Sequence, residues 1–188
     1  MTRFRRASVW IPAFAGTTAA WLLSFSAMAA ETTEPLKNHY NDPFVQVTKA
    51  IAACPLPRGP FMTEREAQAE AHPRIERGTT CFMAGKCKEP NAYRYDAKIA
   101  ERAQTAVVDA VRETPALAKS SVWLTVQRRF VFAQGCVGDR RQIAQWEALL
   151  RAVPDVEYVS ANFAVGSTAK QFQRVPYPVM PTGNAKLP

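Results

Sequence analysis

The chain has 188 residues, of which 47% are hydrophobic, and a formal net charge of +8 at pH 7. This length leaves room for one ordinary domain with extensions, and the apolar content is that of a globular protein rather than a disordered chain. The basic surplus suits contact with anionic lipid or acidic partners, but it is also common in exported proteins and selects no function by itself.

The first thirty residues have the pattern of a secretory signal peptide. Three arginines within the first six residues precede an uncharged apolar run from Trp10 to Ala29, which ends in small residues at the A-x-A spacing. We predict cleavage after Ala29 or Ala30; a retained membrane anchor is the alternative, because the run approaches the roughly 20 residues that span a bilayer. Cleavage removes three of the 24 basic residues and leaves a net charge of 21 − 16 = +5. The mature chain is expected to be periplasmic, with membrane association left open.

Export decides how the four cysteines, Cys54, Cys81, Cys87 and Cys136, are interpreted. An even number of cysteines in an oxidising compartment predicts two disulfides. Three connectivities exist and the spacing does not select among them; Cys81–Cys87 with Cys54–Cys136 is the pairing that we favour. Two alternatives would make the protein an enzyme: a zinc site formed by Cys54, Cys81, Cys87 and His72, or a cysteine nucleophile beside His72.

Residues 31–95 are expected to form a linker followed by a helical and loop extension. The polar residues 31–41 predict a mobile linker. Asp42-Pro43 is a good helix start, and apolar residues at i, i+3 and i+7 predict a helix from Pro43 to about Ala53. Thr63 and Glu66 have the spacing of a capping box, which predicts a second, surface helix to about residue 71. Residues 74–95 are rich in loop signals, so we assign residues 42–95 to the extension.

Residues 96–165 have a regular order of helix, strand, strand, helix and strand. Apolar residues at helical spacing predict helices from Asp96 to about Thr114 and from Asp139 to about Val153, each opened by its aspartate. Between them, period-two alternation on either side of residues 127–129 predicts a tight antiparallel hairpin, and residues 156–165 predict a last strand. The proline-rich residues 167–188 are expected to be a flexible tail.

Several landmarks in this region resemble the BON domain, a small bacterial envelope module. The resemblance is carried by Val107 to Pro115-Ala116-Leu117, Val122-x-Leu124-x-Val126, Val131-x-Ala133-x-Gly135-x-Val137 and Ala152-Val153-Pro154-Asp155-Val156-x-x-Val159. Arg129 and Asp155 depart from it, because they stand where that family often has glycine. The resemblance covers about residues 96–165. It implies an α+β fold, an open αββαβ sandwich, in proteins that bind phospholipid surfaces or other envelope proteins and are not known for catalysis.

Strict alternation along the strands predicts an aromatic second face of the sheet. The inward face should pack on the two helices and comprises Val122, Leu124, Val126, Val131, Ala133, Val137, Val159, Ala161, Phe163 and Val165. The opposite face then carries Trp123, Phe130, Phe132, Cys136 and Tyr158, an apolar patch that is uncommon on a soluble monomer. We expect the extension to cover it with Phe44, Ile51, Phe61, Phe82 and Tyr93; binding of a partner or lipid to this face is the alternative.

Two arginine pairs are the candidate binding residues. Arg128 and Arg129 lie at the predicted hairpin turn, and Arg140 and Arg141 open a helix, where backbone amides favour anions. One hypothesis is that together they contact lipid headgroups. The reading that we favour is that they only keep the surface soluble.

We therefore expect a non-enzymatic protein that binds or scaffolds at the bacterial envelope, with an anionic phospholipid surface or an envelope protein as partner. A subunit of a secretion or surface assembly and a cysteine- or zinc-dependent periplasmic enzyme are the alternatives. Homo-oligomerisation is left open. No cofactor, metal or nucleic-acid partner is expected.

Overall fold

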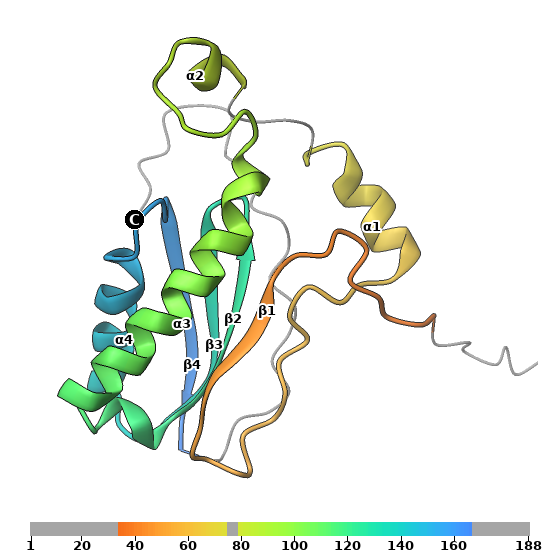
Figure 1. The fold of residues 1–188 in the computed structure, drawn as a ribbon. Coiled ribbons are helices and arrows are strands. Elements are labelled where there is room, and N and C mark those ends of the chain that lie inside the picture. Colours follow the sequence, from red (N-terminus) through yellow and green to blue (C-terminus); the bar gives the residue numbers. More distant parts are fainter. Residues whose placement is uncertain (1–33, 75–78, 167–188) are drawn as a thin grey trace, which may run out of the picture. The chain divides into compact units, whose positions relative to one another are not determined.

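The structure is a computed structural model and describes residues 34–74 and 79–166. The predicted signal peptide and the proline-rich segment 167–188 lie outside these residues. A four-stranded sheet forms the centre, with the strand order β1-β2-β3-β4 (Figure 1). The strands are β1 Phe44–Lys49, β2 Ser121–Gln127, β3 Phe130–Val137 and β4 Tyr158–Val165. Strands β1, β2 and β3 are antiparallel neighbours, and β4 is parallel to β3.

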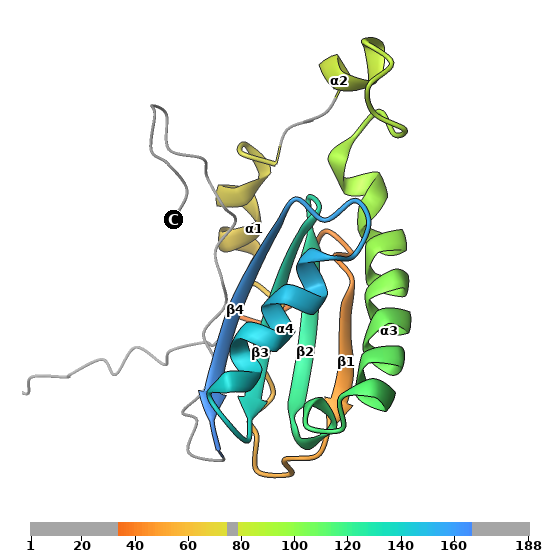
Figure 2. The ribbon, with the colours of Figure 1, turned by 90° about the vertical axis from the view of Figure 1, so that its left-hand side faces the viewer.

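Two longer helices cover one face of this sheet (Figure 2). They are α3, Asp96–Glu113, and α4, Arg141–Arg151, while α1 and α2 span Glu64–Ala71 and Thr79–Met83. Short 3-10 turns, Ala92–Tyr95 and Leu117–Lys119, precede α3 and β2. The described chain is thus mixed α+β, as expected, and the order α3, β2, β3, α4, β4 is the order predicted for residues 96–165.

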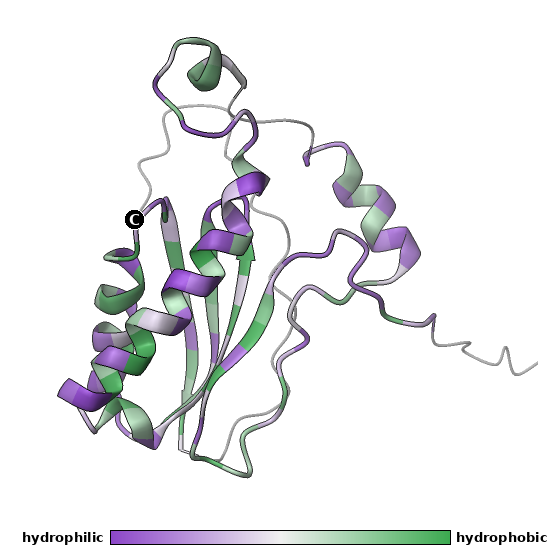
Figure 3. Cartoon of the chain, viewed as in Figure 1, coloured by the Kyte–Doolittle hydropathy of each residue, from purple (hydrophilic) through white to green (hydrophobic). Residues whose placement is uncertain are grey.

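The main core lies between the sheet and these two helices. Most of the inward-facing strand residues predicted from the alternation are buried there, namely Val122, Leu124, Val126, Val131, Ala133, Val137 and Val159. Ile99, Ala103 and Val107 of α3 and Trp146 and Leu150 of α4 meet them. Each large side chain buried in this way contributes about 1.5–3 kcal/mol. Figure 3 shows the hydrophobic residues running along the strands. Val165, at the end of β4, is exposed instead.

The predicted helix from Pro43 to Ala53 was wrong, because Phe44–Lys49 forms strand β1. Phe44, Val47 and Ile51 have helical spacing, but the β-branched run Val45, Val47 and Thr48 fits a pleated strand better. Pairing with β2 decides the outcome: Val45 lies opposite Leu124, and both valines pack against the main core. The extension therefore contributes an edge strand to the sheet, and residues 42–95 and 96–166 share one compact unit.

Residues 34–41 are also not the linker that the sequence suggested. Lys37 and Met62 form an isolated β-bridge, with both backbone N–H···O distances at 2.9 Å. The Tyr40 hydroxyl donates to the carbonyl oxygen of Ala67 at 2.6 Å. This segment is held against α1 by long-range contacts that its polar composition did not reveal.

The capping box at the start of α1 is confirmed. The backbone N–H of Glu66 donates to Thr63 Oγ1 at 3.2 Å, and that of Thr63 donates to Glu66 Oε2 at 2.8 Å. Arg58 pairs with the same Glu66 carboxylate, and the pKa of Glu66 is lowered by these hydrogen bonds although burial opposes the shift. The loop before α1 and the first turn of α1 are therefore tied together.

Candidate functional site

The four candidate arginines lie at opposite ends of the sheet. Arg128 and Arg129 form the turn before β3, whereas Arg140 and Arg141 follow its far end. Eight residues at about 3.3 Å each separate the pairs by roughly 25 Å. Arg128 is only 5% exposed, while Arg140 and Arg141 are exposed. The structure therefore does not bring the four side chains together, and their contact with lipid headgroups stays a prediction.

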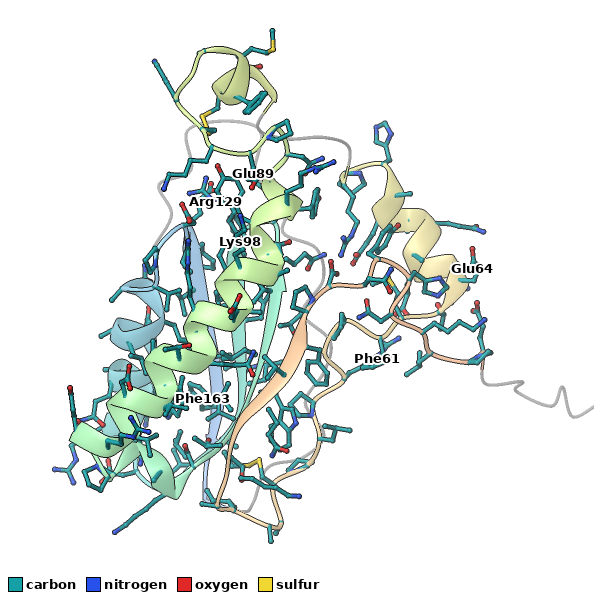
Figure 4. All side chains as sticks on the ribbon, in the orientation of Figure 1. Phe61, Glu64, Glu89, Lys98, Arg129 and Phe163 are labelled. Atoms are coloured by element: carbon teal, nitrogen blue, oxygen red, sulfur yellow. A yellow bond between two sulfur atoms is a disulfide. The ribbon has the colours of Figure 1, made fainter. Side chains whose placement is uncertain are left out.

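The side chains of Arg129 and Arg141 donate hydrogen bonds within the protein. Arg141 Nη2 lies 2.8 Å from Asp139 Oδ2, and these hydrogen bonds lower the pKa of Asp139 to about 2. Arg129 Nε donates to the carbonyl oxygen of Asp155 at 2.8 Å, and its guanidinium lies 5.0 Å from the centre of the Tyr95 ring (Figure 4). Arg129 and Asp155 both have positive φ, 65° and 72°. They therefore adopt the conformation for which a glycine is favoured, and the contact between them stabilises it.

Asp96 holds the hairpin turn rather than capping α3. Its two carboxylate oxygens each accept a backbone N–H, from Arg128 and Arg129, at 2.7 Å. Both turn residues have positive φ, 55° and 65°, the geometry of a two-residue turn that Asn-Gly normally occupies. The buried carboxylate compensates for this strain. Burial nevertheless raises the pKa of Asp96 to about 7, while the two turn amides act in the opposite direction.

The raised pKa of Asp96 predicts a pH-dependent stability. Between about pH 4, near its ordinary pKa, and pH 7, the folded chain retains a proton that the unfolded chain releases. The free energy of unfolding should therefore fall as pH rises through this window, by up to about 4 kcal/mol for one group with this shift. Urea unfolding at pH 4, 5.5 and 7 measures it. The difference between the parent and Asp96→Asn isolates Asp96, and equal slopes in both proteins would exclude it as the cause.

All four cysteines are in disulfides, with the pairing that we favoured. Cys54–Cys136 joins the extension to β3, and Cys81–Cys87 closes a short loop. Cys54 and Cys136 are buried together with Trp123, and Phe44 and Ile51 pack against them. The extension therefore covers this part of the aromatic face. The thiolates that a zinc site or a cysteine nucleophile requires are bonded to each other in this structure.

Within the described ranges, no group of three or more His, Cys, Asp or Glu residues is placed to hold a metal ion. No helix of the described part is long and apolar enough to cross a membrane.

Family models, curated proteins and solved structures give no match to this chain. A functional assignment must therefore rest on the geometry of this chain's described residues.

A cavity of about 500 Å³ adjoins the start of β1. Arg74 lines this cavity together with Tyr40 and Tyr93: its guanidinium lies 3.8 Å from the centre of the Tyr40 ring and 5.5 Å from that of Tyr93. Arg74 Nη1 donates to Asp42 Oδ1 at 3.1 Å, and Glu70 lies 3.5 Å from Nε. Both acids are buried and raise the pKa of Arg74, although desolvation opposes them. The acidic side chains here hold Arg74, which fastens the segment after α1 to the segment before β1.

The loop closed by Cys81–Cys87, here called the disulfide loop, has a different character. It includes most of α2, and its Phe82 and Met83 side chains are 40% and 79% exposed. Lys86 and Lys88 beside them are exposed and form no ion pair in the described part of the chain. Figure 3 shows α2 as a hydrophobic segment beside hydrophilic residues. The loop thus presents two large apolar side chains next to two lysines.

The base of the disulfide loop is anchored to the rest of the domain. The backbone N–H groups of Lys88 and Glu89 donate to the Tyr95 hydroxyl at 2.9 and 3.0 Å. Glu89 also lies 3.5 Å from Lys98 of α3, and both side chains are seen near the start of that helix (Figure 4). The exposed apolar residues are therefore carried on a loop that is fixed at both its disulfide and its base.

Proposed function

We propose that this chain is an exported, disulfide-bonded, non-enzymatic protein of the bacterial envelope that binds an anionic phospholipid surface through its disulfide loop. The observation that carries the proposal is the exposure of Phe82 and Met83 beside Lys86 and Lys88. The unit of residues 96–165, with its BON-like sequence landmarks, is the frame that presents this loop. The two disulfides are compatible with the oxidising compartment that the predicted signal peptide implies.

The composition of the disulfide loop matches the boundary between lipid headgroups and acyl chains. An aromatic and a flexible apolar side chain gain free energy when they leave water for this boundary, and neighbouring lysines gain from anionic headgroups. Each lysine near such a surface contributes about 1 kcal/mol. Closure of the loop by Cys81–Cys87 reduces the conformational entropy lost on binding.

Co-sedimentation of the mature chain with vesicles tests this function. Vesicles of phosphatidylglycerol mixed with phosphatidylcholine should retain the protein at low salt and release much of it at moderate salt, because the lysine contribution is screened. Vesicles of phosphatidylcholine alone should bind it more weakly. A mature chain that stays in the supernatant with anionic vesicles at low salt would contradict the proposal and favour an envelope protein as the partner.

The lysine contribution has its own expected magnitude. In Lys86→Gln/Lys88→Gln, the loss of about 2 kcal/mol should weaken binding to anionic vesicles about 30-fold. The matched control is Arg140→Gln/Arg141→Gln, which removes two exposed cations more remote from the loop in the sequence and should have a smaller effect. Equal losses in the two double variants would show that only net charge matters.

A further inference from the structure

The sheet face opposite α3 and α4 is aromatic beyond the part that the Cys54 segment covers. Phe130 and Phe132 lie on this face toward the hairpin end, and the ring of Phe130 is 5.5 Å from that of Tyr158. The two phenylalanines are only 5% and 4% exposed, whereas the helices that pack on the sheet lie on its other face (Figure 2). In the described part of the chain, Phe44, Ile51 and Cys54 cover this face, and they pack on Trp123 and Cys136.

The same end of the face holds two buried hydrogen-bond donors without acceptors. Gln127 Nε2 and Arg128 Nη1 have no hydrogen-bond partner in the part of the chain that the structure describes. Gln127 lies opposite Phe130 in the β2–β3 register, and the Arg128 guanidinium is 4.7 Å from the centre of the Phe130 ring. Arg128 Nη2 is 4.0 Å from Glu157, beyond ordinary hydrogen-bond length. Because a buried donor without an acceptor is energetically costly, this site favours a ligand that brings acceptors.

Residues 167–188 follow the last strand of the sheet and are long enough to reach this site. Strand β4 is parallel to β3 and ends at Val165, at the far end from the hairpin. Gly166 has a φ of +76°, which permits a turn. The face measures roughly 25 Å from this end to the hairpin, and the 22 residues 167–188 span up to about 70 Å when extended.

We propose that residues 167–188 dock along the aromatic face, with the part around Tyr177 over Phe130 and Phe132. Prolines at 176, 178 and 181 lack N–H groups, so this part brings carbonyl acceptors and few donors. It is therefore complementary to Gln127 Nε2 and Arg128 Nη1, two donors that have no acceptor among the residues that the structure describes. Proline-rich segments bind aromatic surfaces in this way at low entropic cost. The aromatic face is then an internal docking surface, independent of lipid contact by the disulfide loop.

Photo-crosslinking in the full mature chain tests this docking. Benzoylphenylalanine in place of Tyr177 should, on irradiation of the dilute protein, form an intramolecular cross-link to the aromatic face. After reduction and tryptic digestion, the cross-link should be found in the peptides Ser120–Arg128 or Phe130–Arg140. The same photoreactive residue in place of Val108, which is exposed on α3, should give no product with these two peptides.

Each other outcome counts against the proposal. A product with peptides outside β2 and β3, or no intramolecular product, would overturn it. A product with the same peptides that joins two chains would also overturn it, because the occupant would then be the tail of a second copy. Size-exclusion chromatography of the irradiated sample separates the intramolecular product from the product that joins two chains.

Discussion

Replacement of Gly135 with alanine should lower the free energy of unfolding by more than about 3 kcal/mol, or prevent folding. Gly135 lies within β3, opposite Val122, and has a φ of +146°. A Cβ at this position would lie 2.0 Å from the backbone carbonyl oxygen of Ser121. Overpacking of a core costs about 1–3 kcal/mol. Here the added Cβ would clash with the backbone of a paired strand, which cannot move aside as a side chain can, so we expect a larger loss. Urea unfolding followed by circular dichroism measures it.

Gly85 provides the matched control for this substitution. It also has a positive φ, +67°, but an added Cβ would meet no atom within 4 Å. Gly85→Ala should therefore cost only the backbone strain of a left-handed alanine, about 1–2 kcal/mol. If both variants lose the same stability, the close approach of β2 to Gly135 is not what requires glycine.

Removal of the Cys54–Cys136 disulfide should cost about 4 kcal/mol. The bond closes a loop with a sequence separation of 82, and the chain-entropy model assigns a loss of this size to a loop of that length. Cys54→Ala/Cys136→Ala also loosens the packing around the buried Trp123. The free energy of unfolding from urea titration should show a loss that is a large fraction of the 5–15 kcal/mol typical of a domain.

The second disulfide is the internal control for the first. Cys81–Cys87 has a sequence separation of 6, for which the same model gives about 2 kcal/mol. Cys81→Ala/Cys87→Ala should therefore be the more stable of the two double variants by about 2 kcal/mol. The reverse order of stability would contradict the role assigned to Cys54–Cys136 in holding the extension on the sheet.

The elements that depend on local signals were predictable from the sequence, whereas those that depend on distant partners were not. The Thr63 capping box and the alternation on either side of Arg128-Arg129 involve residues within a few positions of each other. Strand β1 pairs with β2, more than 70 residues away, and the helical spacing of Phe44 and Val47 gave no sign of this partner. Asp96 is well placed to cap a helix, but its carboxylate instead accepts a backbone N–H from a turn 32 residues further along the chain.

The candidate site was predictable only in its residue types. Phe82 and Met83 between two cysteines, followed by lysines, can be read directly from the sequence. Their exposure cannot, and Phe82 was expected to cover the aromatic face, which Phe44 and Ile51 do instead. The two arginine pairs lie at opposite ends of the sheet because they are 11 residues apart and the intervening residues include an extended strand.

Binding of the disulfide-loop variant Phe82→Ser/Met83→Ser to anionic vesicles tests the central claim most directly. The control, Leu56→Ser/Val108→Ser, removes two other exposed apolar side chains from outside the loop. At equal thermal stability, the sedimented fraction should show at least tenfold weaker binding for the loop variant and parent-like binding for the control. Parent-like binding by the loop variant would contradict the claim that this protein contacts phospholipid through the disulfide loop.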